Sequence, residues 1–211
     1  MLFSELSHDF RQKVHSMQLS LAGQDKNGTT ETSRALVTIS DLRRYLDNFL
    51  SMTRMDSITV SAMRSSVEIS DLFQSLALQF EDEADNLGID LRFRYSSLCL
   101  HTDKFWLTRV LENLVANALK FGKSKVLVAA RARSNGVQFL IMDDGQGMPV
   151  SHIDIKKSRS FVRGESAEQH AHGFGLGLTM VYRAVKLIDA GIRIHSRPNV
   201  GTLIQIDFAR K

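Results

Sequence analysis

The 211-residue chain contains a single cysteine, two prolines and no apolar run near the roughly 20 residues that a membrane-spanning helix needs. One cysteine excludes an intramolecular disulfide framework, and because no signal peptide is recognisable we expect a reducing, cytosolic environment. Cys99 lies in an apolar run, so we expect a buried and inert thiol. The sequence also lacks the cysteine and histidine spacings of a metal site.

The chain has no strong charge of one sign. Lys and Arg number 27 and Asp and Glu number 23, which gives a formal net charge of +4. The basic residues alternate with acidic ones and form no stripe, so we expect no nucleic-acid partner. With 43% hydrophobic and 24% charged residues, the composition is typical of a globular protein.

Two amphipathic helices are predicted in the first 60 residues. Apolar residues recur at steps of three and four over residues 2–21, a polar loop follows at 23–30, and residues 31–55 show heptad spacing. Two such helices in a hairpin cannot bury broad apolar faces by themselves. We therefore assign residues 1–60 to a helical hairpin and expect a homodimer built on a four-helix bundle.

After a junction rich in Ser and Thr, residues 61–211 are predicted to form an α/β sandwich, so that the whole chain belongs to the α+β class. Gly88 and Gly191 are interpreted as the stop signals of two helices. The expected strands are 67–69, 89–95, 98–100, 125–133, 137–142, 192–197 and 202–209, and the expected helices are 71–87, 104–121 and 176–190.

Three segments of this second domain contain residues suited to a nucleotide. Asn113 and Asn117 are four residues apart, so they share one face of a helix, and their amide oxygens suit Mg²⁺. Asp143 precedes a glycine-rich loop and can accept a hydrogen bond from an exocyclic amine such as that of adenine. The glycine-rich turn at 173–177 opens into a helix, where backbone N–H groups can approach phosphate oxygens. Together the segments predict one ATP site.

In this order the segments resemble the motifs of sensor histidine kinases. Residues 113–117 resemble the N box, 143–147 the G1 box and 173–178 the G2 box, while 160–166 resemble the F box of the ATP lid and 6–11 the H box. The resemblance implies a Bergerat ATP-binding fold, with ATP and Mg²⁺ bound. It also implies transfer of the γ-phosphoryl group to a histidine and then to an aspartate of a response-regulator receiver domain.

The resemblance to the H box implies the catalytic residues. His8 lies about 200° around the helix from Leu6, away from the apolar seam, and is the implied phosphoacceptor. Asp9 is the implied general base, and Gln12 occupies the position linked to dephosphorylation of the partner, which leaves a phosphatase activity open. His15 is a rival acceptor on the same face, without an acidic neighbour.

The nucleotide motifs imply the remaining site residues. The D-x-G-x-G register selects Asp143 over the adjacent Asp144, Lys120 can reach a phosphate, and His172 stands where the family usually has glycine. The metal ligands implied are Asn117 and Asn113. The implied ATP-binding residues are Asn113, Asn117, Lys120, Phe121, Asp143, Gly145, Gly147, Phe161, Arg163, Gly173, Gly175, Leu176, Gly177 and Leu178.

Two other functions remain open: a non-enzymatic phosphotransfer or scaffold protein with a degenerate nucleotide domain, and a Bergerat-type ATPase. Such ATPases carry a Glu four residues before the metal-binding Asn, whereas this chain has Asn113, and Glu112 lies about 100° around the helix. The chain begins close to the His8 motif. We therefore expect the cytoplasmic catalytic portion of a longer protein, attached to a membrane only through an upstream segment.

Overall fold

A five-stranded sheet forms the centre of the structure, a computed structural model that describes residues 62–148 and 176–209 together with Arg44, Asn48 and Ser51. The strand order is β2-β4-β5-β7-β6, with β2 parallel to β4 and the other neighbours antiparallel. The strands are β2 (Asp90–Arg94), β4 (Lys125–Arg133), β5 (Gly136–Asp143), β6 (Ala190–Arg197) and β7 (Gly201–Ala209).

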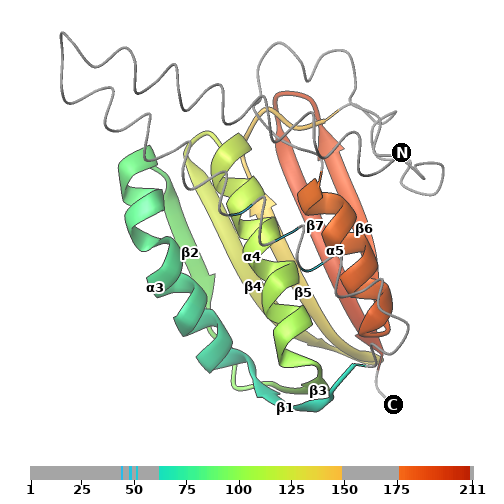
Figure 1. Ribbon diagram of the computed structural model, residues 1–211. Coiled ribbons are helices and arrows are strands. Elements are labelled where there is room, and N and C mark those ends of the chain that lie inside the picture. The colour runs from blue at the N-terminus through green and yellow to red at the C-terminus, as the bar shows by residue number, and fades with distance from the viewer. Residues whose placement is uncertain (1–43, 45–47, 49–50, 52–61, 149–175, 210–211) are drawn as a thin grey trace, which may run out of the picture.

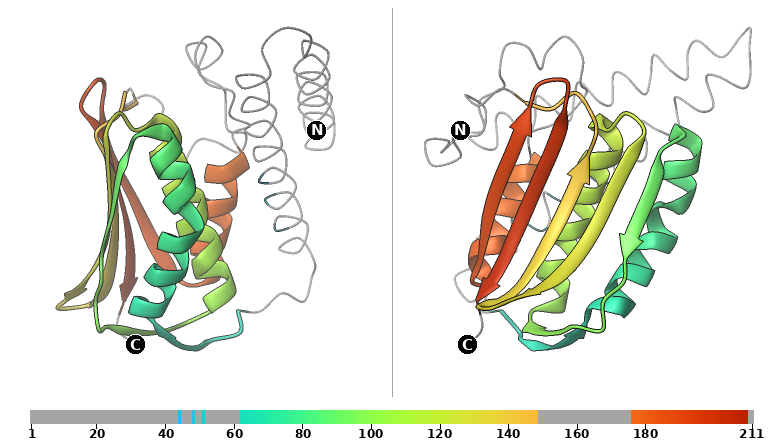
Figure 2. Two further views of the ribbon diagram at one scale, coloured as in Figure 1. Left: turned by 90° about the vertical axis from the view of Figure 1, so that its left-hand side faces the viewer. Right: turned by 180° about the vertical axis from the view of Figure 1, so that it is seen from behind.

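Three helices, α3 (Ile69–Leu87), α4 (Lys104–Phe121) and α5 (Leu176–Leu187), lie side by side on one face of the sheet (Figure 1). The opposite face carries no helix from the described part of the chain (Figure 2). A short antiparallel ribbon pairs β1 (Ser65–Glu68), which precedes α3, with β3 (Cys99–Thr102), which precedes α4. This is the predicted two-layer α/β sandwich. The predicted hairpin of residues 1–60 lies outside the described residues, apart from three helical positions.

The core lies between the helices and the sheet because apolar residues alternate along the strands and face the helices. Phe139 of β5 packs edge to face against Phe73 of α3, at 6.1 Å between ring centroids, and against Phe208 of β7, at 5.9 Å. Phe93 of β2 extends this row, with its ring 5.6 Å from Phe73. Trp106 is only 4% exposed and belongs to the core.

Several helices and strands end at or near the residues predicted from the sequence, and others do not. Gly88 closes α3 in the left-handed region, with φ of 65°, as its position predicts. The predicted helix over 176–190 is too long, because α5 ends at Leu187 and Asp189 makes the left-handed turn at φ of 55°. Gly191 is therefore a residue of strand β6 and no stop signal. The strand expected at 67–69 is β1, which ends at Glu68.

Cys99 corrects another expectation, because it is exposed. It lies in β3, where alternate side chains point to opposite faces, and its Sγ atom is 2.7 Å from Ser66 Oγ of the neighbouring strand. Only one face of the two-stranded ribbon packs on the core, so an apolar run in the sequence does not bury every member.

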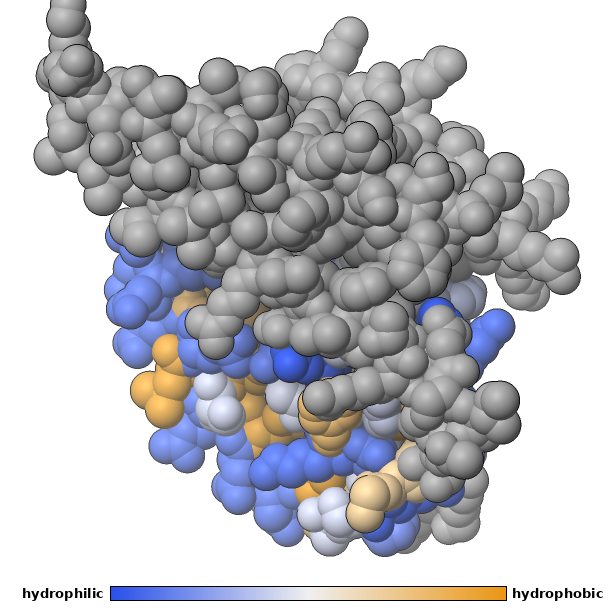
Figure 3. Space-filling model, viewed as in Figure 1, coloured by the Kyte–Doolittle hydropathy of each residue, from blue (hydrophilic) through white to orange (hydrophobic). Residues whose placement is uncertain are grey.

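The surface on the helical side is largely hydrophilic where it is drawn in colour, with separate hydrophobic patches (Figure 3). In the described part of the chain, no helix combines the length and apolar character that crossing a bilayer would require.

Candidate nucleotide site

Helix α4 carries most of the candidate residues, and both of its ends are fixed. Asp103 caps its start, accepting hydrogen bonds from the backbone N–H of Trp106 at 3.1 Å and of Met63 at 2.7 Å. At the other end, the backbone oxygen of Phe121 accepts from Gln146 N at 3.3 Å. The helix is thereby joined to the loop that follows β5, which contains the second motif.

Asn113 and Asn117 lie on the same side of α4, as their spacing predicts. Asn113 is buried and Asn117 is half-buried. A Cβ atom added to Gly177, in the first turn of α5, would lie 3.1 Å from Asn113 Oδ1 and 3.9 Å from Asn117 Nδ2. The first and third motifs therefore meet, and a side chain at residue 177 would fill the space beside both amides.

A third asparagine, which no motif in the sequence indicated, reaches the same point. Asn48 donates from Nδ2 to Asn113 Oδ1 over 2.8 Å, and Asn113 donates from its own Nδ2 to the backbone oxygen of Arg109 over 2.9 Å. Asn48 and Asn113 are 6% and 5% exposed. A polar residue inside a heptad pattern was the one available signal, and it could not identify a partner 65 residues away.

Asp143 ends β5 with its carboxylate turned toward the following loop, where Oδ1 accepts from Gly145 N over 2.9 Å. Burial raises the pKa of Asp143 above its ordinary value and Asp144 adds to this effect, while hydrogen bonds from Gly145 and Thr202 act in the opposite direction. A half-buried carboxylate with acceptor capacity left over is suited to bind an amine of a ligand.

The glycines of the second motif are required by close backbone contacts. A Cβ atom on Gly145 would lie 1.8 Å from the backbone oxygen of Phe121, at the end of α4. Gly147 has φ of 63°, in the left-handed region, and a Cβ atom there would lie 2.0 Å from the backbone oxygen of Arg197. The loop after Asp143 is thus packed between the end of α4 and the β6–β7 turn.

Asp144, next to Asp143, is engaged by its own chain. Its Oδ1 atom accepts from the backbone N–H groups of Lys123 at 3.1 Å, Ser124 at 2.9 Å and Lys125 at 2.9 Å, and Ser124 Oγ donates to Oδ2. These bonds, led by that of the Ser124 hydroxyl, hold the pKa of Asp144 well below its usual range. Asp144 therefore closes the turn between α4 and β4, which favours Asp143 as the ligand-binding acid.

Two further side chains of α4 were weighed from the sequence. Glu112 forms an ion pair with Arg109 at 3.0 Å, so its carboxylate is held one turn from the asparagines. Lys120 lies at the other end of the helix, with Nζ 5.9 Å from the ring centroid of Phe121.

The described residues fit a nucleotide with a divalent cation. Mg²⁺ takes oxygen ligands, and the side-chain amides of Asn113 and Asn117 carry oxygens of this kind. The backbone N–H groups at the start of α5 suit phosphate oxygens, and Gly177 leaves open the space that a Cβ atom would fill. Asp143 adds an acceptor for an amine.

Several predicted site residues lie outside the described part of the chain. These are His8, Asp9, Gln12, Phe161, Arg163, Gly173 and Gly175. Leu176 begins α5 and Leu178 is half-buried against the core.

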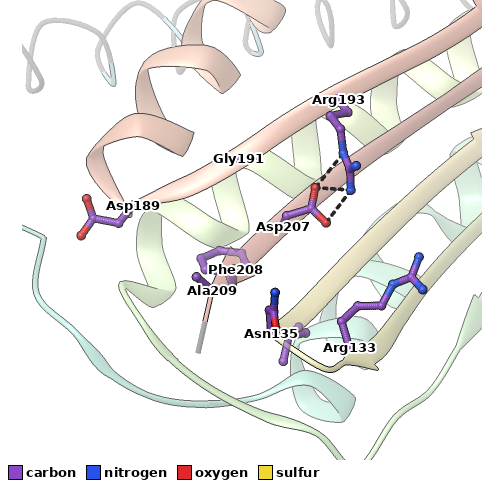
Figure 4. Close-up of a pocket in the computed structure, with 9 residues that line it drawn as sticks. Arg133, Asn135, Asp189, Gly191, Arg193, Asp207, Phe208 and Ala209 are labelled. Atoms are coloured by element: carbon purple, nitrogen blue, oxygen red, sulfur yellow. Dashed lines mark hydrogen bonds and ion pairs between the residues drawn. The ribbon is translucent and has the colours of Figure 1, made fainter. Parts of the chain in front are cut away.

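A separate hollow of about 430 Å³ lies at the far end of the sheet, between the β4–β5 turn and the ends of β6 and β7 (Figure 4). Arg193 and Asp207 form an ion pair at 2.9 Å beside it. Asp207 also accepts from the buried Gln138 at 2.6 Å, whose own oxygen accepts from Arg131 and Arg133. These polar groups are satisfied within the sheet and contribute nothing to the nucleotide site.

Comparison with known sequences agrees with this geometry. Residues 102–211 match the family of histidine kinase-, DNA gyrase B-, and HSP90-like ATPases. Sensor histidine kinase YvrG of Bacillus subtilis is 25% identical over 218 residues, covering 98% of this chain and 37% of the relative. Sensor-like histidine kinase SenX3 of Mycobacterium tuberculosis is 25% identical over 208 residues, covering 94% and 51%. The chain thus spans about half or less of these relatives.

Solved structures show the same fold. The histidine kinase AdeS of Acinetobacter baumannii aligns with a TM-score of 0.71 at 15% identity, covering 96% of this chain and 97% of that one. Full-length ShkA in complex with AMPPNP aligns at 0.66 and 21% identity, covering 96% and 44%. Histidine kinase ThkA in complex with the response regulator TrrA aligns at 0.70 and 16% identity, covering 100% and 61%. With more than half of its residues matched by the family, this chain belongs to the histidine kinase-, DNA gyrase B- and HSP90-like ATPases and has a histidine kinase catalytic core.

Proposed function

We propose that this chain autophosphorylates on His8 as part of a two-component sensor histidine kinase and passes the phosphoryl group to a response regulator. The observation that carries the proposal is that the side-chain amides of Asn113 and Asn117 on α4 lie next to Gly177 at the start of α5. Asp143 joins them through the loop whose Gly145 packs on the end of the same helix. This combination supplies metal ligands, phosphate-binding N–H groups and an amine acceptor together.

Each residue has a role toward ATP. Asp143 accepts from the exocyclic amine of adenine, which fixes the orientation of the base. Asn117, supported by Asn113, would hold the Mg²⁺, which would neutralise charge on the phosphates. The N–H groups of the first turn of α5 bind phosphate oxygens, and Lys120 adds a positive charge.

The transfer itself depends on residues of the N-terminal segment. A ring nitrogen of His8 attacks the γ-phosphorus, the bond from that phosphorus to the β–γ bridging oxygen breaks, and ADP leaves. Asp9 takes the imidazole proton. The phosphoryl group then passes to an aspartate carboxylate of the receiver domain, and Gln12 orients a water for its later hydrolysis. Most of the rate enhancement comes from positioning and electrostatics.

The residues around Asn113 favour a kinase over an ATPase. Hydrolysis needs a base close to the attacking water, and an asparagine amide cannot take a proton. Glu112, the nearest carboxylate in the sequence, is paired with Arg109 at 3.0 Å. The site therefore holds the nucleotide without activating water, which suits transfer to a histidine.

The proposal includes two partners and a location. A second copy pairs through the helical hairpin of residues 1–60, since its apolar seams need a partner. The receiver domain of a response regulator is the phosphoryl acceptor, supported by the ThkA complex with TrrA. We place this core in the cytoplasm. The chain spans about half or less of its relatives, so we assign any membrane anchor to other parts of the whole protein.

Labelling with γ-³²P-ATP and Mg²⁺ tests the proposal. We expect acid-labile, alkali-stable label on the purified chain, its loss in His8→Gln with nucleotide affinity unchanged, and loss of nucleotide binding in Asn117→Ala. Asn135→Ala, an exposed asparagine of the β4–β5 turn, is the matched control. Label that persists in His8→Gln would point to His15.

Two other outcomes would identify the alternative functions. Steady phosphate release without labelled protein indicates an ATPase. A folded chain that binds no nucleotide indicates a phosphotransfer or scaffold protein.

A further inference from the structure

The hydrogen bond between Asn48 and Asn113 links the N-terminal segment to the nucleotide site. Asn48 Nδ2 lies 2.8 Å from Asn113 Oδ1, and both residues are more than nine-tenths buried, at 6% and 5% exposed. The oxygen in this bond is one of the two amide oxygens that the proposed function assigns to Mg²⁺. Asn48 holds one of the two acceptor positions of this oxygen and fills space beside it, so a metal ion with its waters competes with Asn48 for this place.

The surroundings of that oxygen show why the space is lacking. Asn48 Nδ2 lies 2.8 Å from the oxygen and 3.8 Å from the position that a Cβ atom on Gly177 would take, so the Asn48 amide occupies part of the space that Gly177 leaves open. Mg²⁺ binds at about 2.0–2.1 Å, demands octahedral geometry and usually keeps several waters. With the Asn48 amide in this space, an ion that keeps its waters reaches the oxygen only after Asn48 withdraws.

Two other described residues of the same segment are engaged or buried. Arg44 donates to Glu83 of α3 at 3.0 Å, and Ser51 is 3% exposed. Arg44, Asn48 and Ser51 are all helical, and steps of four and three residues put them on one helix face. The segment therefore contacts the nucleotide domain through Asn48 with Asn113 and through Arg44 with Glu83.

We propose that Asn48 acts as a latch, withholding Asn113 Oδ1 from the metal of the bound nucleotide until the segment carrying Arg44, Asn48 and Ser51 undocks. This inference rests on the proposed function and adds a regulatory step to it. Undocking and metal-nucleotide binding are then linked, since each favours the state in which the Asn48–Asn113 bond is broken.

The latch is expected to be weak enough to release. A buried neutral hydrogen bond shifts an equilibrium by roughly 2- to 12-fold. The half-exposed pair of Arg44 and Glu83 shifts it by at most about 5-fold. Only undocked molecules bind the metal–nucleotide, so the apparent dissociation constant is the intrinsic constant divided by the undocked fraction. Removing Asn48 raises the undocked fraction and should therefore tighten binding.

Binding of Mg²⁺ and AMPPNP to the full chain, measured by calorimetry, tests the latch. Asn48→Ala should bind about 2- to 10-fold more tightly than wild type with Mg²⁺, with a clearly smaller gain in EDTA. Arg44→Ala should show a smaller gain, and Asn135→Ala, a matched change in the β4–β5 turn at the far end of the sheet, should show none. An equal gain with and without Mg²⁺, or no gain, overturns the latch.

Hydrogen–deuterium exchange on the wild-type chain gives a readout that needs no variant. Peptides covering residues 44–51 should exchange faster when Mg²⁺ and AMPPNP are added than with AMPPNP in EDTA. Unchanged or slower exchange overturns the proposal. If neither wild type nor any variant binds the nucleotide, the proposed function fails instead, whereas binding without coupling to Asn48 refutes only the latch.

Discussion

Two adjacent aspartates at the end of β5 belong to different regions: Asp144 binds the turn between α4 and β4, and Asp143 lies at the edge of the nucleotide site. In the turn between α4 and β4, the carboxylate of Asp144 accepts from three backbone N–H groups and the Ser124 hydroxyl, and its pKa is held well below the usual range. At the site edge, one residue earlier, burial raises the pKa of Asp143. The ionised form is favoured by the fold in the first region and disfavoured in the second.

The difference separates residues that stabilise the fold from residues kept for a ligand. A polar group whose partners come from its own chain contributes stability and has little left to offer a ligand. A charged group held at a cost to the fold is a candidate for function, because a ligand supplies the missing partner. On this criterion Asp144 belongs to the turn and Asp143 to the site.

The largest expected effect comes from Gly145, where the two regions touch. In Gly145→Ala the new Cβ atom would lie 1.8 Å from the backbone oxygen of Phe121, so either the loop or the end of α4 must move. We expect a loss of about 3 kcal/mol in the free energy of unfolding, together with loss of nucleotide binding. Urea denaturation and calorimetry measure the two effects.

Gly191→Ala is the matched control for this change. A Cβ atom at Gly191 meets nothing closer than Asp207, at 3.9 Å, so the free energy of unfolding should change by less than about 0.5 kcal/mol. Equal stability of the two variants would show that the contact at Gly145 is easily relieved.

Most of the sandwich could be predicted from the sequence because the residues that begin, end and pattern its helices lie within or next to each helix. The capping residue Asp103 and the amphipathic pattern define α4 over the predicted residues, and Gly88 marks the end of α3. The errors occur where tertiary contacts decide. Asp189 makes the turn into β6 that Gly191 was expected to make, and Cys99 lies on the exposed side of a ribbon whose pairing no local pattern shows.

The site was predictable in part for the same reason. The spacing of Asn113 and Asn117 shows that they share a face, and the glycine at residue 177 must approach them closely. The partners of Asp144 lie about 20 residues earlier, and that of Asn48 lies 65 residues later. Neither contact leaves a periodic signal, so the structure was needed to separate the two aspartates and to find the third asparagine.

The second prediction removes the carboxylate of the turn. Asp144→Ala should lower the free energy of unfolding by about 1–2 kcal/mol, a figure reduced for solvent screening at this partly exposed position. The depressed pKa means that this stability is present above about pH 4, where the unfolded carboxyl is ionised, and is lost as pH falls through the folded value. The gap between wild type and variant should therefore close in strong acid, as followed by urea denaturation across pH.

The last and smallest effect on stability concerns Asp143, and its sign is reversed. Because burial raises the pKa of Asp143, the unfolded carboxyl ionises first as pH rises, and wild type loses stability from about pH 4 upward until the folded carboxyl is ionised. Asp143→Asn removes this cost, so at neutral pH it should be more stable by roughly 0.5–1 kcal/mol, and the gain should vanish below about pH 4.

The same change should weaken nucleotide binding by at least roughly tenfold, because it replaces a charge-assisted hydrogen bond to the adenine amine by a neutral one. Urea denaturation from about pH 3 to pH 7 and calorimetry with Mg²⁺ and AMPPNP give both readouts on one protein. A variant that is more stable and binds poorly assigns Asp143 to the ligand. The opposite result would be an Asp143→Asn variant that loses stability, as Asp144→Ala does, and keeps its affinity for the nucleotide. Both carboxylates would then serve the fold, and the distinction between the two aspartates would be wrong.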